Sequence, residues 1–257
     1  MAASREELLG EAKRLLPGYL EATTGLKHES KGIRRSELFF FYALTTPLHP
    51  ARIIESGRAR AQSTLVLARL FPQIAIVSLE SDPDSPDAAI AEERLRPYQN
   101  VECRFGDSLR LLAKLVEPGD VVLIDGPKDF RALKLAFHLL ASSQVSAVFV
   151  HDLWPASPAR SFIDRHLPSA LLSDEPSWVQ HYAFLDKKKR SMETPTPGSR
   201  RAYGATLGYF GAKLDNYARR LWQCRLAQGA DRLRETTRRL SHQPSSVRPK
   251  DFAIVSR

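Results

Sequence analysis

The segment of residues 53–64, IIESGRARAQST, constrains the fold more than any other part of this chain. An apolar run ends in Glu55, and Gly57 follows two residues later. Glycine permits the tight turn by which a buried strand leads directly into a helix, and the small residues Ala59, Ala61 and Ser63 leave room beside that turn. Because the first turn of such a helix presents unpaired N–H groups, the segment predicts a ligand-binding crevice at a strand end.

The residues around this turn narrow the choice of ligand. A dinucleotide fingerprint would require glycines at the positions of Ala59 and Gln62, so the sequence disfavours pyrophosphate binding here. Glu80 ends the next apolar run, residues 74–80. A carboxylate at a strand end can accept hydrogen bonds from both hydroxyl groups of a ribose. We therefore expect Glu55 and Glu80, at neighbouring strand tips, to hold a cationic or hydroxyl-bearing ligand, with Glu80 suited to a ribose.

Strand and helix patterns alternate along the chain, which predicts an α/β fold: a doubly wound, mostly parallel, Rossmann-like sheet with helices on both faces. We expect strands at residues 52–56, 74–80, 101–105, 121–124 and 147–150, helices at 62–70, 86–96, 108–115 and 129–141, and a terminal antiparallel hairpin of strands 178–185 and 205–210. Helical extensions are expected at residues 4–16, ended by Pro17 and Gly18, and at 213–240. A helix at 36–44 has an aromatic face that could cover a ligand or pack on the sheet.

Four motifs follow one another along the chain: Glu-x-Gly-x-x-x-small-x-Ser at residues 55–63, Glu80 with Asp82-Pro83-Asp84 behind it, Phe105-Gly106-Asp107-Ser108, and the apolar run that ends in Asp125. In this order they resemble the class I S-adenosylmethionine-dependent methyltransferases, nearest to the catechol and caffeoyl-CoA O-methyltransferases and the cephalosporin-hydroxylase-like group. The likeness covers residues 36–211, between an N-terminal helical extension (1–35) and a basic C-terminal helix and tail (212–257). Ala61 departs from the pattern, because the family usually has a glycine there.

The resemblance implies S-adenosylmethionine as the cofactor and assigns a role to each matching residue. Glu55, Ser56, Gly57, Ala59 and Ser63 would shape the methionine end, Glu80 would hold the ribose, Asp107 and Ser108 would face the adenine, and Asp125 would lie beside the cofactor. From the residues alone, Asp107 or Ser108 is also a suitable N-cap for the following helix, and the two roles are compatible.

Asp125 and Lys128 place a carboxylate and an amine at the sheet edge where open α/β folds bind ligands. A carboxylate there can bind a hard cation such as Mg²⁺, and the cation would lower the pKa of a substrate hydroxyl. Lys128 could then take the hydroxyl proton, if burial or its neighbours lower its own pKa. The resemblance implies the same arrangement, since catechol-type enzymes have a metal-binding Asp and a basic Lys at this spacing. The alternative is a Gly-Pro turn with an exposed Lys128 and with Asp125 as a helix cap.

The fifth expected strand ends in His151 and Asp152, where the family has an acidic or amide pair that completes the metal shell. Asp125, His151 and Asp152 are therefore the candidate metal ligands, although imidazole suits Mn²⁺, Fe²⁺ or Zn²⁺ better than Mg²⁺. Two alternatives stay open. His151 and Asp152 could form an acid–base pair, which makes them catalytic candidates together with Lys128, or the histidine ring could be satisfied by backbone groups.

Charge is unevenly distributed along the 257 residues. After residue 185, 17 Lys or Arg accompany 6 Asp or Glu, against 21 and 23 before it, so the excess of +9 belongs to the C-terminal third. That third would make any contact with nucleic acid, anionic lipid or an acidic partner, or its charges would simply solubilise a helix. Cys103 and Cys224 have no ligand-like spacing, and we find no signal-peptide core or membrane-spanning run, so we expect a cytoplasmic protein.

These observations predict an enzyme that transfers a methyl group from S-adenosylmethionine to an oxygen atom of a small molecule, with Mg²⁺ or Mn²⁺ as a second candidate cofactor. One alternative is a domain of this fold that has lost catalysis and binds a partner through its basic C-terminal helix. A further alternative is an RNA methyltransferase, although the chain has no Asn-Pro-Pro-Tyr or Asp-Pro-Pro-Tyr run after the fourth strand. Motifs of serine hydrolases, Walker-type nucleotidases and zinc proteases are absent from the sequence.

Overall fold

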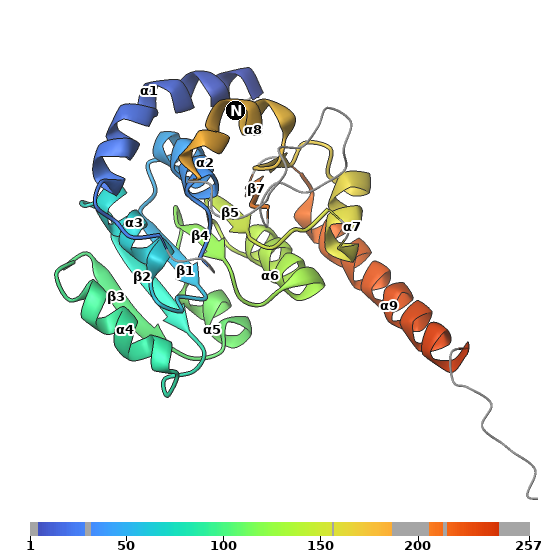
Figure 1. The fold of residues 1–257 in the computed structure, drawn as a ribbon. Helices are drawn as coiled ribbons and strands as arrows, with labels where there is room; N and C mark the ends of the chain where they lie inside the picture. Colours follow the sequence, from blue (N-terminus) through green and yellow to red (C-terminus); the bar gives the residue numbers. More distant parts are fainter. Residues whose placement is uncertain (1–4, 29–31, 156, 187–205, 213–214, 242–257) are drawn as a thin grey trace, which may run out of the picture.

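Seven strands, of which only β7 runs against the others, form the sheet at the centre of the computed structural model, which describes residues 5–28, 32–155, 157–186, 206–212 and 215–241 (Figure 1). The strand order is β3 (Val101–Phe105), β2 (Ala75–Glu80), β1 (Arg52–Ser56), β4 (Val121–Ile124), β5 (Ala147–Val150), β7 (Gly208–Gly211) and β6 (Leu171–Leu172). Only β7 runs against β5 and β6. The sheet confirms the predicted α/β class with an antiparallel end.

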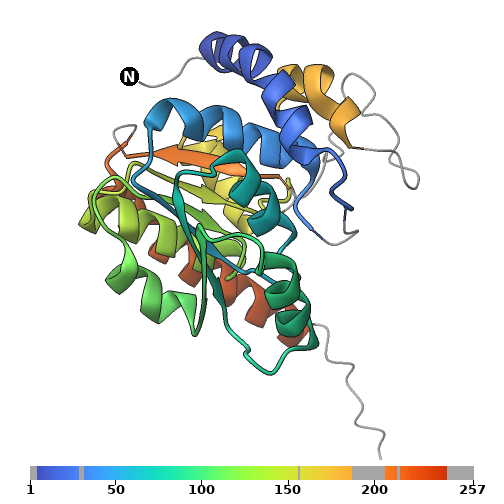
Figure 2. The same ribbon diagram turned by 90° about the vertical axis from the view of Figure 1, so that its left-hand side faces the viewer.

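Helices cover both faces of the sheet, as Figures 1 and 2 show. One face packs against α1 (Arg5–Thr23), α2 (Arg35–Thr45), α3 (Gln62–Leu70) and α8 (Pro176–Tyr182), and the other against α5 (Ser108–Leu115), α6 (Asp129–Ser142), α7 (Pro158–His166) and α9 (Tyr217–Ser241). Near one edge, α4 (Pro86–Leu95) packs on Ala61. Because strand side chains alternate, Val121 and Leu123 enter one core and Val122 and Ile124 the other. Strands buried on both faces explain the continuous apolar runs in the sequence.

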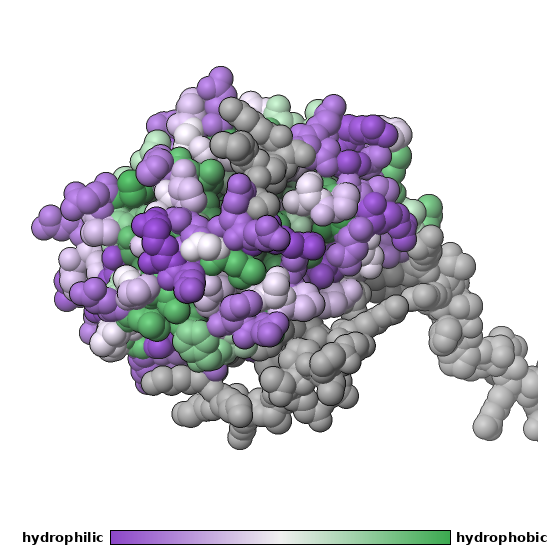
Figure 3. All heavy atoms as spheres, turned by 90° about the horizontal axis from the view of Figure 1, so that it is seen from above, coloured by the Kyte–Doolittle hydropathy of each residue, from purple (hydrophilic) through white to green (hydrophobic). Residues whose placement is uncertain are grey.

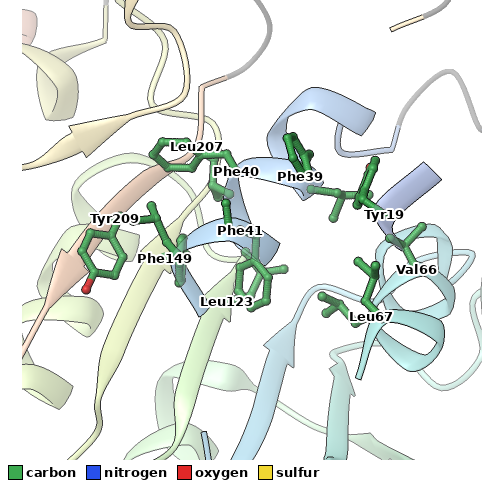
Figure 4. Close-up of a cluster of buried hydrophobic side chains, with 14 of the residues drawn as sticks. Tyr19, Phe39, Phe40, Phe41, Val66, Leu67, Leu123, Phe149, Leu207 and Tyr209 are labelled. Atoms are coloured by element: carbon green, nitrogen blue, oxygen red, sulfur yellow. The ribbon is translucent and has the colours of Figure 1, made fainter. Parts of the chain in front are cut away.

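The aromatic face of α2 packs on the sheet rather than covering a ligand. Phe39, Phe40 and Phe41 are at most 1% exposed, and the ring of Phe41 lies 4.4 Å from that of Phe149 on β5 (Figure 4). The ring of Phe39 lies 5.5 Å from that of Trp178 on α8. Each buried aromatic side chain contributes about 1.5–3 kcal/mol. These contacts fix α2 above the carboxyl half of the sheet, where it supplies a residue to the site described below.

Two predictions about secondary structure are wrong. Residues 178–185 belong to α8 and to a 3₁₀ turn, Ala183–Leu185, and do not form the predicted edge strand. A helix forms here because Pro176 suits the first turn of a helix, and because Trp178 and Tyr182, four residues apart, then pack together on α2. The partner of β7 is therefore the two-residue strand β6. The first helix also continues through Pro17 to Thr23, since Tyr19 and Thr23 keep their buried positions. A short 3₁₀ turn, Thr46–Leu48, follows α2.

The helix α9 has two apolar faces. Tyr217 and Cys224 are buried against the sheet side, whereas Trp222, Leu226 and Leu233 are 62%, 55% and 71% exposed. No helix in the described part of the chain is long and apolar enough to cross a membrane. The face of the molecule seen from above is mostly hydrophilic, with small hydrophobic areas between the polar side chains (Figure 3). The predicted tail beyond residue 241 lies outside the described residues.

Candidate active site

The sheet changes winding direction between β1 and β4. From β1, the chain builds β2 and β3 on one side and β4 and β5 on the other. In open α/β sheets, ligands bind outside the carboxyl ends of the strands at such a switch point. The predicted site residues lie at the ends of β1 and β2, in the loops after β1, β3, β4 and β5, and in the first turns of α3 and α5.

At the switch point, the turn after β1 touches the turn after β4. The carbonyl oxygen of Ser56 accepts hydrogen bonds from the backbone N–H groups of Asp125 (2.8 Å) and Gly126 (3.1 Å). Gly57 has φ +96°, and a Cβ placed there would lie 3.0 Å from backbone atoms of both Asp125 and Gly126. Glycine is therefore required at position 57 both by the backbone conformation and by the close approach.

Ser56 and Ser108 lie beneath this contact. The hydroxyl group of Ser56 lies 2.7 Å from that of Ser108 and also contacts the carbonyl oxygen of Gly126. Ser56 is fully buried and Ser108 is 9% exposed. They join the loops after β1, β3 and β4, so their contribution to a ligand site is to hold these loops together.

Glu80 lies at the tip of β2, as predicted, and its side chain contacts the turn that contains Gly57. Its Oε2 accepts a hydrogen bond from the N–H of Ala59 (2.8 Å), and its Oε1 accepts one from the N–H of Ser81 (2.7 Å). Ala59 and Ala61 both have left-handed backbone conformations, with φ of +43° and +63°. The side chain of Glu80 thus fixes the turn while part of it remains open to solvent.

Glu55 does not face this space, which differs from the predicted ligand contact. It is fully buried, and its Oε2 accepts hydrogen bonds from the hydroxyl groups of Thr64 and of Ser78 (2.8 Å). Burial raises the pKa of the Glu55 carboxyl above its ordinary value. Glu55 therefore joins β1 to β2 and to α3, whose first turn also contains the buried Ser63.

Asp107 caps α5: its Oδ1 accepts a hydrogen bond from the N–H of Leu109 at 2.9 Å. The predicted capping role is confirmed. The side chain of Asp107 is exposed, and its contact with the adenine stays a prediction. Arg58, which the sequence did not indicate, is buried next to Phe105 of β3. Its Nη1 donates to the carbonyl oxygen of Ser78 (2.7 Å), and its guanidinium lies 4.8 Å from the centre of the Phe105 ring.

Next to the Gly57 turn, charged side chains from three elements form one cluster. Lys128 Nζ lies 2.6 Å from Asp125 Oδ1 and 2.5 Å from Asp152 Oδ2. His151 Nδ1 lies 2.7 Å from the same Asp125 oxygen, and His151 Nε2 lies 3.2 Å from Glu37 Oε2. The histidine ring is thus held by side-chain carboxylates. The alternative in which backbone groups satisfy the ring is not what the structure shows.

The protonation states of the cluster follow from these contacts. Burial lowers the pKa of His151, but the carboxylates of Asp125 and Glu37 outweigh burial and raise the pKa to about 10. Burial also lowers the pKa of Lys128, yet Asp125 and Asp152 hold that pKa above its usual value. The pKa of Asp125 is lowered, because hydrogen bonds and charges of His151 and Lys128 outweigh its burial. The lowered lysine pKa on which the predicted base role depends is therefore not found.

Glu37 belongs to the site and was missed from the sequence. It is 1% exposed on the first turn of α2; its Oε2 accepts the N–H of Arg34 (3.0 Å), and its Oε1 accepts the N–H of Thr206 (3.1 Å). Burial raises the pKa of Glu37, but His151 and then the N–H and charge of Arg34 outweigh burial and keep that pKa below its ordinary value. The capping signature that would reveal such a Glu begins with Ser or Thr three residues earlier, where this chain has Arg34.

The predicted metal ligands come together, but their hydrogen bonds do not suit a metal ion. Ligand atoms of Asp125, His151 and Asp152 lie within 4.8 Å of one another. A histidine ligand needs a nitrogen lone pair directed at the metal, whereas both ring nitrogens of His151 are directed at carboxylate oxygens. Lys128 also lies between the two aspartates. As arranged, these residues do not fit a metal, and the metal site stays a prediction.

No protein-family model and no curated protein matches the chain. Solved structures of similar fold include the SAH-bound methyltransferase PaMTH1 of Podospora anserina (16% identity over 79% of this chain and 93% of that one, TM-score 0.45). Another is the SAH complex of an O-methyltransferase from Bacillus cereus, with 19% identity over 79% of this chain and 90% of that one and a TM-score of 0.44. A third is the SAM complex of the O-methyltransferase TomG from Streptomyces achromogenes, with 17% identity over 82% of this chain and 92% of that one and a TM-score of 0.45. At these values the likeness concerns the fold, and no residue's role is taken from it. These three similar structures are methyltransferases with bound SAH or SAM.

Proposed function

We propose that this protein transfers a methyl group from S-adenosylmethionine to a hydroxyl oxygen of a small-molecule acceptor. The observation that carries the proposal is the pairing, at one switch point, of a glycine turn facing Glu80 with a cluster of charged groups around Lys128. The first half suits an aminoacyl nucleoside, and the second suits an oxygen that loses a proton.

Three groups at the strand tips would hold the cofactor. The backbone of the Gly57 turn, at the carboxyl end of β1, would lie against the methionine end. The carboxylate of Glu80 would accept the ribose hydroxyl groups, and that of Asp107 would accept the exocyclic amine of the adenine. When bound, S-adenosylmethionine supplies an electrophilic methyl group on a positively charged sulfur.

On the acceptor side, Lys128 and Asp152 would act on the hydroxyl group. With its pKa raised, Lys128 keeps its proton and stabilises the developing oxyanion as a cation, so it does not serve as the base. The adjacent carboxylate of Asp152, 2.5 Å from Lys128 Nζ, would accept the hydroxyl proton. With its proton on Asp152 and its charge stabilised by Lys128, the acceptor oxygen would be ready to take the methyl group that the bound cofactor supplies, the sulfur keeping the electron pair as a neutral thioether.

The test is a radiolabel transfer assay. The purified protein is incubated with S-adenosylmethionine labelled in the methyl group and with a panel of catechols, simple phenols and aliphatic alcohols. We expect label in the organic product of at least one hydroxyl class, and loss of transfer in Lys128→Met with unchanged cofactor binding. Lys114→Met, which alters an exposed lysine on α5, is the matched control. Transfer by Lys128→Met at the rate of the wild type would contradict the assigned roles.

The other two candidate functions, a binding module without catalysis and an RNA methyltransferase, both depend on the basic C-terminal third. No contact of the described residues favours either over transfer to a small molecule. They remain alternatives, and transfer of label to RNA but to no small hydroxyl compound would favour the second.

A further inference from the structure

The ring of His151 lies between two carboxylates, one on each side. Nδ1 is 2.7 Å from Asp125 Oδ1, and Nε2 is 3.2 Å from Glu37 Oε2, in a position where the histidine is 6% exposed. An ionised carboxylate only accepts hydrogen bonds, and a neutral imidazole has one N–H. Both contacts are hydrogen bonds at once only when both ring nitrogens carry a proton, so the ring is a cation.

Glu37 supports this state through its other contacts. Its two oxygens accept N–H groups from Arg34 and Thr206, which lie on different segments of the chain. A buried carboxylate that accepts several N–H bonds is stabilised in its ionised form. A buried anion at this point requires positive charge beside it, which His151 supplies in direct contact and to which the charge of Arg34 adds.

The cluster already contains two side-chain cations without an added ion. Three carboxylates, from Glu37, Asp125 and Asp152, surround the two cations Lys128 and His151. Two single positive charges stand among the acidic groups where one doubly charged ion would otherwise be needed. A metal ion would have to displace Lys128 from both aspartates and remove a proton from His151.

We infer that His151 and Lys128 together take the place of the divalent metal ion that the catechol-type methyltransferases use, so that this site works without a bound metal. Asp125 then serves as the bridge between the two cations, and Glu37 is a positioning residue that holds the ring of His151. The statement about the reaction rests on the proposed function. The statement about metal binding does not, because it is tested without cofactor or acceptor.

The experiment is a titration with Mn²⁺, followed by the electron paramagnetic resonance signal of the free ion. The informative variant combines His151→Asp with Glu37→Gln, because the new carboxylate would otherwise face the buried Glu37. His151→Asn is the second variant, since it adds an amide oxygen and no charge. His138→Asp, which changes an exposed histidine on α6, is the matched control for the change from histidine to aspartate.

We expect no Mn²⁺ binding by the wild type or by His138→Asp at millimolar metal, so that any dissociation constant of theirs lies above this concentration. The double variant, His151→Asn, or both should bind Mn²⁺ with a dissociation constant at least about tenfold below that limit. Stoichiometric Mn²⁺ binding by the wild type would overturn the inference. It would also be overturned if both variants, folded by circular dichroism, bound no more metal than the wild type. Calorimetric titration of the same samples with S-adenosylmethionine reports separately on the proposed function.

Discussion

Replacing Gly57 with alanine tests the geometry of the switch point. The backbone at Gly57 has φ +96°, and a left-handed conformation costs an L-residue about 1–2 kcal/mol. The added methyl group would also lie 3.0 Å from Asp125 C and Gly126 N, which are backbone atoms and cannot swing aside. Overpacking of this kind costs about 1–3 kcal/mol. The lower entropy of the unfolded alanine chain offsets about 0.4–1 kcal/mol, which leaves a net loss of about 1–5 kcal/mol.

The assay is urea unfolding monitored by circular dichroism, with free energies from linear extrapolation. Gly10→Ala is the matched control, because Gly10 lies within α1 with nothing within 4 Å of an added Cβ. We expect it to stabilise the protein by about 0.5–1 kcal/mol. If the unfolding free energy of Gly57→Ala lay within about 0.5 kcal/mol of the wild type, the turns after β1 and β4 would not approach as described.

Three further predictions concern the charged cluster. Glu37→Gln and His151→Asn, alone and combined, should show a coupling of about 1–3 kcal/mol in a double-mutant cycle of unfolding free energies, since the two side chains form a buried charged hydrogen bond; additive effects would refute that contact. The pKa of His151 in the folded protein is about 10 against an ordinary 6.5, so the stabilisation by the charged ring should be complete below pH 6.5 and lost as pH rises through 10. The difference in unfolding free energy between the wild type and His151→Asn should therefore shrink between these pH values. A difference that stayed constant would count against a charged ring. Lys128→Met should lower turnover by about 10²–10³-fold while leaving the Kd for S-adenosylmethionine unchanged, as measured by label transfer and calorimetry; a raised Kd with normal turnover would assign Lys128 to the cofactor.

Local patterns were sufficient to predict the five parallel strands β1 to β5, whose bounds lie within about a residue of the expected ones. In β1, β2, β4 and β5, burial on both faces gives apolar runs that glycine and proline punctuate, whereas β3 is mostly exposed. Residues 178–185 were misassigned because a short apolar run satisfies both strand and helix periods. Long-range packing of Trp178 against Phe39 and Phe40 decides between them, and the local sequence does not contain that contact.

The site was only partly predictable for a related reason. Residues at strand tips, such as Glu80, Asp125, Lys128 and His151, could be found because parallel strands end at one edge of the sheet. Glu37 could not be found, because it comes from a helix that reaches the site only through the packing of α2 on β5. The burial of Glu55 and the raised pKa of Lys128 depend on neighbours that the order of residues does not specify.

Cofactor binding is the central claim, and calorimetric titration with S-adenosylmethionine tests it most directly. We expect the wild type to bind one equivalent with a micromolar Kd. Loss of the charge-assisted ribose contacts in Glu80→Ala should weaken binding at least about tenfold. Glu93→Ala, which changes an exposed glutamate on α4, should bind as the wild type does. No heat of binding at millimolar S-adenosylmethionine, or equal affinity in Glu80→Ala and the wild type, would contradict the account.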